Sequence, residues 1–290
     1  NVPLAQGTSH SFDAEGDSLS AAIALDPVDP LTGEFIHTVV DLELPSFGVP
    51  FRHTRTYRSR VDFRGPFGPA WDHGYNQVLR ELADVELSAP PPPATAPNPA
   101  PRFPALTGAI GTWNLVNQVE GSGCGPALGL STGQGSMLQF REIGRNGATI
   151  EYRSQVARLT LVGTINAGVT TWALSAPTGE VRHFDAQGRL SRWVDANGVG
   201  LTLVWGTDPS GQPRVTSVTD SAGRLVTYVY DAAGRVTSVT EGASLLQASY
   251  TYDANGLLST AHTAKGKSER YEYTFAATLH RGTWIPEGML

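Results

Sequence analysis

The sequence predicts an all-β fold, a curved antiparallel sheet of β-hairpins arranged as an open ribbon or a partial shell. Two observations predict it: the composition and an internal repeat. Charged residues make up 17% of the 290 residues, whereas an average globular domain has roughly 25%. The chain also contains 32 glycines and 20 prolines, which favour turns and leave little helix surface. We therefore expect short strands joined by turns along most of the chain.

The internal repeat is Asp-x-x-Gly, with a period of about 11 residues. That length accommodates a strand of about five or six residues and a turn of about four or five. The Asp carboxylate can accept a hydrogen bond from the amide two residues on, and the Gly can adopt positive φ, as in a bulged hairpin loop. The predicted structural turn residues are Asp185, Gly188, Asp195, Gly198, Asp220, Gly223, Asp231, Gly234, Asp253 and Gly256, with a further copy at Asp208 and Gly211.

The segments between these turns alternate as strands do. In the run 225–230, Val226, Tyr228 and Tyr230 fall on one face, and Tyr250 and Tyr252 repeat the spacing. We expect these tyrosines to be structural aromatics that stack across neighbouring strands, at about 0.2–1 kcal/mol for each pair. Helix is disfavoured there because β-branched and aromatic residues dominate.

Composition divides the chain into six parts. The divisions are a polar N-terminal arm at 1–25, a front module at 26–88, a proline-rich loop at 89–107, a β-strand segment at 108–175, the repeats at 176–275 and a C-terminal tail at 276–290. In the front module, Trp71 and Tyr75 are predicted to form a structural aromatic cluster.

Charge and cysteine content exclude several classes of partner. The net charge is −6 and only two of the 21 basic residues are lysines, so no basic face is available for nucleic acid. No apolar stretch is long enough to span a membrane. The single cysteine, Cys124, cannot form an internal disulfide, and the seven histidines have no ligand spacing. We therefore predict no cofactor, no metal and no catalytic residues.

Four chemical alternatives compete with these structural roles. Cys124 lies in a glycine-rich loop without a cue for a base, and Asp72 and His73, as neighbours in a strand, point to opposite faces. The repeated aspartates favour turn capping over calcium binding, because each turn supplies one carboxylate. The six tryptophans, at 71, 113, 172, 193, 205 and 284, favour packing over a glycan platform, although a glycan remains a candidate partner.

The repeats 230–235 (Tyr-Asp-Ala-Ala-Gly-Arg) and 252–257 (Tyr-Asp-Ala-Asn-Gly-Leu) resemble the YD repeats of the Rhs family, which includes Tc-toxin shell proteins and teneurins. The segments 184–190 and 220–225 are close variants. The front module is similar to the domain that opens many Rhs shells, at 26–29, 32–35, 41–45, 55–57, 65–68 and 71–75. The resemblance covers about 26–90 and 176–275 of the chain, and repeats behind this ordered front make it specific.

The resemblance implies a β-ribbon that winds into a hollow, non-enzymatic shell, which in toxin systems encloses a polypeptide. A short ribbon would leave two unpaired edges and an uncovered apolar face. We therefore expect self-association into a filament or shell at the cell exterior or surface, by exchange of edge strands or of the 1–25 arm. The alternatives are the N-terminal part of a toxin-enclosing cocoon, completed by the remainder of a larger shell, and a carbohydrate-binding adhesion module.

Overall fold

The computed structural model describes residues 34–61, 63–82, 106–108, 111–113, 127–154, 157–273, 279–280 and 283–284. Every regular element in these residues is a β-strand, and all the strand pairs are antiparallel. The prediction of an all-β sheet of hairpins that does not close into a barrel is confirmed. Within the described residues there is no helix that could cross a bilayer.

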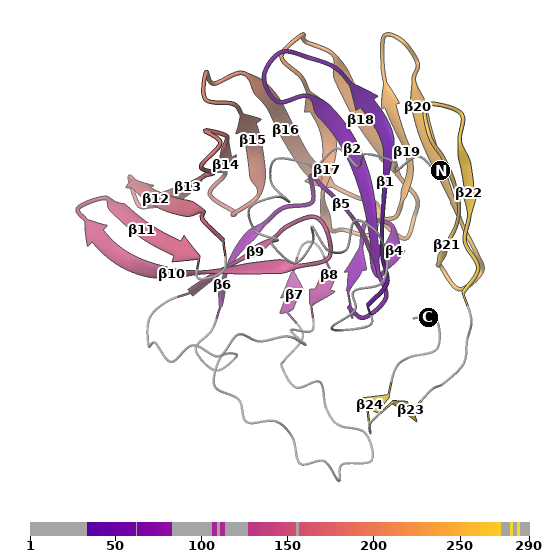
Figure 1. Cartoon of the computed structure of the whole chain (residues 1–290), viewed down its shortest axis with the longest axis horizontal. Helices are drawn as coiled ribbons and strands as arrows, with labels where there is room; N and C mark the ends of the chain where they lie inside the picture. Colours follow the sequence, from indigo (N-terminus) through magenta and orange to yellow (C-terminus); the bar gives the residue numbers. More distant parts are fainter. Residues whose placement is uncertain are drawn as a thin grey trace, which may run out of the picture.

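One large sheet contains 15 strands, in the order β6 and then β9 to β22 in sequence order (Figure 1). The strands are β6 (Leu79–Leu82), β9 (Ala127–Ser131), β10 (Met137–Asn146), β11 (Thr149–Ser154), β12 (Thr160–Asn166), β13 (Val169–Ser175), β14 (Val181–Phe184), β15 (Leu190–Val194), β16 (Gly200–Thr207), β17 (Pro213–Thr219), β18 (Leu225–Tyr230), β19 (Val236–Glu241), β20 (Gln247–Tyr252), β21 (Leu258–His262) and β22 (Ser268–Arg270). Each strand pairs with the next in the sheet order, so the sheet continues without a break across residue 175.

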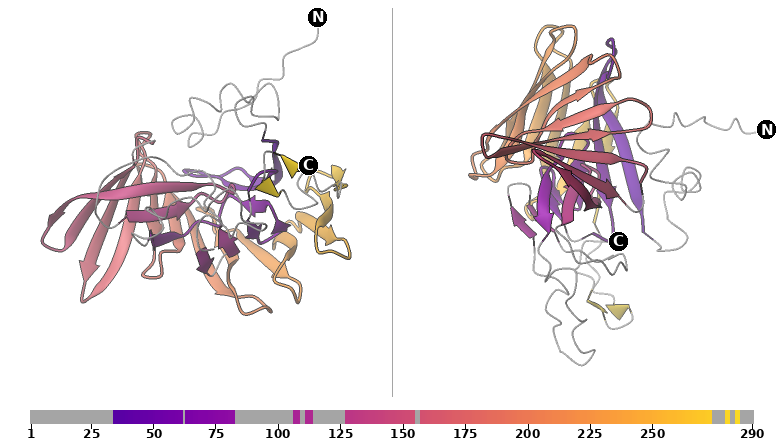
Figure 2. Two further views of the ribbon diagram at one scale, coloured as in Figure 1. Left: turned by 90° about the horizontal axis from the view of Figure 1, so that it is seen from below. Right: turned by 90° about the vertical axis from the view of Figure 1, so that its left-hand side faces the viewer.

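The front of the chain forms a second layer inside the curve of this sheet. Strands β1 (Ile36–Leu44), β2 (Phe51–Arg58) and β5 (Trp71–His73) make a three-stranded sheet, beside the short pair β3 (Arg64–Gly65) and β4 (Gly68–Pro69). Figure 2 shows these purple strands lying within the concave side of the pink, orange and yellow sheet. Two small hairpins complete the described elements: β7 (Leu106–Gly108) with β8 (Gly111–Trp113), and β23 (Leu279–His280) with β24 (Thr283–Trp284).

The core lies between these two layers. One buried cluster joins front residues such as Phe51, Phe67 and Trp71 to inward-facing side chains of the sheet such as Val218 and Val239. The expectation of an uncovered apolar face is therefore wrong, because the chain's own front module covers the inner face of the repeats. In the repeat strands β18 and β20, buried and more exposed side chains alternate, and the buried set faces the front module.

The two edges of the large sheet differ. At the β6 edge, Leu79 donates its amide hydrogen to the Gly188 carbonyl (2.7 Å) and Leu190 donates to the Gln77 carbonyl (3.0 Å), so the β14–β15 turn covers the start of β6. This contact also departs from the expectation of two unpaired edges. At the other end, β22 pairs only with β21 among the described strands. The Tyr271 amide donates toward β21, so the N–H and C=O of Arg270 face the open side.

Several predicted segments lie outside the described residues. These are the 1–25 arm, the loop at 89–107 except for 106–107, most of the 276–290 tail, and the loop that contains Cys124.

Candidate functional site

The Asp-x-x-Gly turns share one hydrogen-bond pattern. In the turn that begins at Asp231, the carboxylate accepts from the amides of Ala233 and Arg235 (both 2.9 Å), and Gly234 has φ +76°. The turns that begin at Asp185, Asp195, Asp208, Asp220 and Asp253 repeat these two bonds, and their glycines Gly188, Gly198, Gly211, Gly223 and Gly256 also have positive φ. Each aspartate thus satisfies turn amides, and the glycine avoids the Cβ strain of this conformation.

Three of these turns also contain an ion pair from an arginine four residues after the aspartate. Arg189, Arg224 and Arg235 each donate from Nε to the second oxygen of their aspartate, at 2.8 Å. Arg235 also lies over the Tyr252 ring, 4.3 Å from its centroid. The arginine therefore ties one turn to the tyrosine of the following repeat.

A second repeated contact joins the strands laterally. The hydroxyls of Tyr230, Tyr252 and Tyr273 donate to the carbonyls of Val215, Val236 and Leu258 at 2.6, 2.6 and 2.9 Å. The Trp205 indole N–H donates in the same way to the Leu190 carbonyl, at 2.7 Å. In each case the partner lies 15 or 16 residues earlier in the chain. The tyrosine of the YD motif thus contributes a polar contact as well as packing area.

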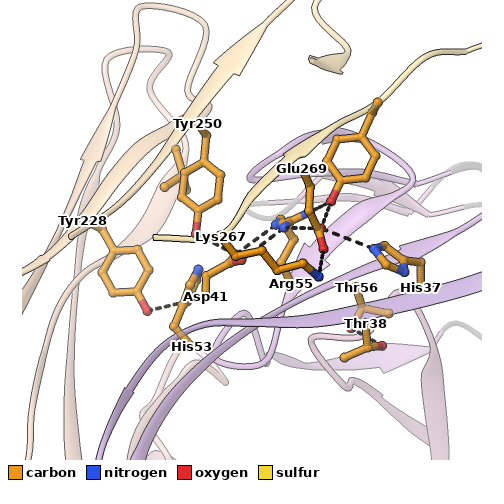
Figure 3. A network of polar contacts seen from close by, with 12 residues as sticks. His37, Thr38, Asp41, His53, Arg55, Thr56, Tyr228, Tyr250, Lys267 and Glu269 are labelled. Carbon is orange, nitrogen blue, oxygen red and sulfur yellow. Dashed lines mark hydrogen bonds and ion pairs between the residues drawn. The ribbon is translucent and has the colours of Figure 1, made fainter. Parts of the chain in front are cut away.

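A buried ion pair fastens the front module to the last hairpins of the sheet (Figure 3). Arg55 on β2 contacts both Asp41 oxygens, at 2.9 and 3.1 Å, and neither side chain is exposed. The sheet completes the network: the Tyr250 hydroxyl donates to Asp41 (2.8 Å), and Arg55 donates to the Tyr271 hydroxyl (2.5 Å) and to Glu269 (3.4 Å). Such a charge pair is stable in the core only when both members keep these partners.

The charges of this network shift the pKa values of its members. Burial alone would lower the pKa of Arg55, but its hydrogen bond and charge interaction with Asp41 raise that pKa above the ordinary value. Burial would raise the pKa of Glu269, but hydrogen bonds from Lys267 and Tyr271 and the charge of Arg55 lower it to about 2. Arg55 and Glu269 therefore both stay ionised over the physiological pH range, and the contact between them persists.

Aromatic rings surround the same arginine. The guanidinium carbon of Arg55 lies 4.8 Å from the Trp71 ring centroid and 5.3 Å from that of Tyr271. The Trp71 indole donates to the Tyr273 hydroxyl (2.9 Å), and its ring lies 5.1 Å from that of Tyr57. The front module and the end of the sheet thus share one aromatic and cationic cluster.

Two buried histidines lie beside this cluster at the same interface. His53 on β2 and His73 on β5 have ring centroids 5.4 Å apart, and Tyr228 of β18 stacks on His73 at 5.5 Å. The Tyr228 hydroxyl is 3.0 Å from His53 Nδ1, whereas His53 Nε2 and His73 Nδ1 have no hydrogen-bond partner among the described residues. Burial, then the positive charge of Arg55, lowers the pKa of His53 to about 3. Burial likewise lowers the pKa of His73 well below its ordinary value.

Asp72 points away from these histidines. Its carboxylate accepts hydrogen bonds from the Asn76 side chain (2.7 Å) and from the backbone amides of His73 (2.9 Å) and Gly135 (3.4 Å). Burial is the largest effect and raises the pKa of Asp72 to about 7, although these donors oppose it. Asp72 and His73 therefore do not form an acid–base pair.

The remaining predicted residues have structural contacts. The Tyr75 hydroxyl accepts a hydrogen bond from the Arg52 amide (2.7 Å) and its ring stacks on Phe51, and Tyr228 and Tyr250 are buried against the front module. Trp193 donates to Glu180 (3.1 Å) and lies 3.8 Å from the Arg182 guanidinium. Within the described residues, no group of three or more His, Cys, Asp or Glu side chains is placed to hold a metal ion.

Sequence reasoning did not single out Asp41, His53, Arg55 and Glu269 as site residues. Asp41 and Arg55 stand within segments that resemble the family's opening domain, but neither their pairing nor their burial is visible from spacing, because 14 residues separate them and 216 separate Arg55 from Tyr271. The β-branched neighbours of Arg55, Thr54 and Thr56, indicate a strand at this position, but they give no signal that the arginine side chain is buried.

Comparison with known families matches two regions of the chain. Residues 25–89 match a family model described as "Domain of unknown function (DUF6531)", and residues 208–244 match the model "RHS Repeat". The chain contains an RHS repeat. The predicted membership of the Rhs/YD-repeat family is thus confirmed, and the two matched regions fall on the front module and on β17 to β19 with their flanking turns.

Solved structures with a similar arrangement of strands include "Crystal Structure of TcdB2-TccC3-Cdc42", at a TM-score of 0.46 and 12% identity over 83% of this chain, and "Crystal Structure of TcdB2-TccC3", at 0.46 and 13% over 84%. This Rhs-repeat protein spans 16% and 17% of the length of those chains. No curated protein matches it.

Proposed function

We propose that this Rhs-repeat protein is a non-enzymatic structural building block of an extracellular or cell-surface assembly, either a filament or a shell. In this proposal the repeats form a curved wall, and the front module braces the wall from inside. Further strands join at the β22 edge, by edge pairing or arm exchange. The RHS-repeat match and the antiparallel sheet support a structural role of the Rhs type.

The difference between the two edges is the observation that carries the proposal. The start of β6 is covered by the β14–β15 turn, whereas Arg270 of β22 directs its N–H and C=O to the open side. Arg270 and Glu272 are exposed there and lie 3.3 Å apart. A strand that pairs with β22 extends the sheet by main-chain hydrogen bonds without rearranging the core.

The test compares two substitutions at one edge position. Arg270→Pro removes the outward N–H, while Arg270→Ala removes the charge and keeps the N–H. Size-exclusion chromatography with light scattering over a range of concentrations is expected to show larger species for the wild type and Arg270→Ala, and loss of those species for Arg270→Pro. A wild-type protein that stays monomeric at every concentration contradicts the proposal.

A second candidate function is the N-terminal part of a toxin-enclosing cocoon. The order of a front module followed by repeats favours it, because the family's shells begin in this way. Here the strand added at β22 belongs to the remainder of a larger shell rather than to another copy. Co-expression with a downstream repeat segment is expected to give a 1:1 particle by light scattering, and a self-associated form that excludes that segment argues for the first function.

A further inference from the structure

Two histidines, His53 and His73, are enclosed where the front module meets the repeats. Their exposed fractions are 0% and 1%. Tyr228 of β18 closes the site from the sheet side: its hydroxyl is 3.0 Å from His53 Nδ1 (Figure 3), and its ring stacks on His73. Phe67 lies against both imidazoles, with ring centroids 5.9 and 6.0 Å away. Both histidines therefore lie between the two layers, out of contact with solvent.

One nitrogen of each ring lacks a hydrogen-bond partner. His53 Nε2 and His73 Nδ1 are buried and unpartnered among the described residues. A neutral imidazole carries one hydrogen, whereas an imidazolium carries a hydrogen on both nitrogens and needs two acceptors. Protonation would therefore bury a donor without an acceptor in each ring, in addition to a charge. The closed interface suits both histidines only in their neutral form.

The charges around the two rings also oppose protonation. The charged and titratable groups on the elements packed around them are Arg55 on β2, Asp41 on β1, Asp72 on β5, Arg214 on β17, Tyr228 on β18 and Tyr250 on β20. Both carboxylates are already occupied, since Asp41 binds Arg55 and Asp72 accepts from backbone amides. Burial first, and then neighbours such as Arg55 and Arg214, lower the pKa values of both histidines.

Two backbone hydrogen bonds bridge the same interface. The Val236 amide donates to the Pro66 carbonyl (2.8 Å), and the Ala264 amide donates to the Asp41 carbonyl (2.8 Å). Pro66 directly precedes Phe67, the ring that packs against both histidines. Each of these bonds joins the front module to the wall, so its amide becomes free to exchange when the two layers separate.

We propose that His53 and His73 form an acid-sensitive latch, the histidine latch: below about pH 6 both rings take up protons, and the front module separates from the wall at β18 to β21. Separation supplies water as the missing acceptor for each ring. Asp72 keeps its site during this opening, because its partners Asn76 and Gly135 lie after β5 and in the β9–β10 turn, away from the separating strands. This inference does not depend on the proposed assembly.

The number of protons taken up determines how steeply the opening depends on pH. In the open form both histidines have the ordinary pKa of about 6.5, so opening becomes about 60-fold more favourable between pH 6 and pH 5. A single histidine gives about eightfold. Glu269 stays mostly ionised over this range in both forms and changes the ratio little.

Overall unfolding has a weaker dependence on pH than this local opening. Unfolding also exposes Asp72, whose pKa is about 7 in the folded chain. Its carboxyl group is therefore protonated when folded and loses that proton on unfolding, which opposes the histidines. The change between pH 6 and pH 5 then falls to about sevenfold, so the two processes can be told apart.

Hydrogen exchange of the full chain at pH 6 and pH 5, corrected for the intrinsic exchange rate at each pH, measures the opening. The protection factors of the Val236 and Ala264 amides are expected to fall about 60-fold in the wild type and about eightfold in His53→Phe or His73→Phe. The double variant is expected to show no fall. His262→Phe removes an exposed histidine of β21 and is the matched control, expected to behave as the wild type does.

The reference is the Ile165 amide, which donates to the Ala148 carbonyl within the wall (2.8 Å) and is expected to keep its protection. The latch is overturned by a wild type in which Val236 and Ala264 lose no more protection than Ile165 does. A fall of about sevenfold at all three amides indicates overall unfolding and also contradicts the latch. So does a double variant that keeps the full fall of the wild type. If a variant does not fold, the wild-type comparison decides alone.

Discussion

Removing the positive charge of Arg55 tests whether the front module is fastened to the wall by the buried network. In Arg55→Met the Asp41 carboxylate stays fully buried and keeps the Tyr250 hydroxyl as its side-chain donor, having lost two guanidinium hydrogen bonds of 2.9 and 3.1 Å. Breaking a buried pair by removing one partner costs about 3–5 kcal/mol of unfolding free energy, since the remaining charge is uncompensated.

A double-mutant cycle separates this effect from a loss of packing. Asp41→Leu with Arg55→Met removes both charges, and replacing a whole buried pair by apolar residues is often neutral or stabilising. The control is Arg145→Met, which breaks an exposed pair with Glu142 at 3.3 Å and should cost about 1 kcal/mol or less.

The assay is thermal unfolding followed by circular dichroism and by tryptophan fluorescence, which reports on the buried Trp71 among other indoles. A midpoint shift of about 2–4 °C per kcal/mol for a domain of this size class predicts a fall of about 10 °C for Arg55→Met. The double variant is expected within a few degrees of the wild type. If Arg55→Met melts as Arg145→Met does, or if the double variant is as unstable as the two single costs added, the reasoning about the network is refuted.

Three further predictions concern the turns, the tyrosines and pH. Gly223→Ala should lower the free energy of unfolding by about 1 kcal/mol, from the positive φ alone. Gly234→Ala should lower it by about 2 kcal/mol, because the added Cβ would also meet Asp208 and Ser210. Equal melting midpoints for the two variants would contradict this difference. Tyr230→Phe and Tyr252→Phe should each lower the free energy of unfolding, measured in urea, by about 1 kcal/mol, because a strand carbonyl loses its hydroxyl donor. A loss of stability smaller than that of Tyr→Phe changes at other positions would argue against the lateral hydrogen bond. Between about pH 6.5 and 4, the unfolded chain carries protons on both His53 and His73, whereas the folded chain carries one on Asp72 and none on these histidines. The unfolded state therefore binds one proton more, and the free energy of unfolding should fall by about 1.4 kcal/mol for each pH unit of acidification. His53→Phe removes one of the two histidine protons and should flatten this dependence on pH.

The turns were predictable because all their determinants are local. The Asp acceptor, its two amide donors and the positive-φ glycine lie within five residues, so one motif contains the whole geometry. The turn near Glu241 shows where this reasoning ends. Gly242 marks a turn in the sequence, but the left-handed residue is Leu245, because the Glu241 side chain caps a longer loop.

The covering of the inner face was not predictable from the repeats. The alternation of Val226, Tyr228 and Tyr230 predicts that one face of the strand is buried. The spacing does not indicate which other part of the chain covers that face. The answer depends on contacts such as Tyr228 with His53, 175 residues apart, and Tyr250 with Asp41, 209 residues apart. The strands of the front module and the repeats could both be predicted from the sequence. Their packing against each other could not, because it depends on the path of the chain in three dimensions.

Several of these long-range contacts lie at the open end of the wall. Each central hairpin is held by neighbours on both sides, whereas β22 pairs with β21 alone among the described strands. The front module supplies the missing support: the Asp41 carbonyl accepts a hydrogen bond from the Ala264 amide (2.8 Å), Arg55 holds Glu269 and Tyr271, and Trp71 holds Tyr273. A terminal strand without such contacts would fray, because its pairing to one neighbour barely offsets the entropy of ordering it. The buried network therefore does more than fill a core, since it holds in register the strand at which the proposed assembly extends.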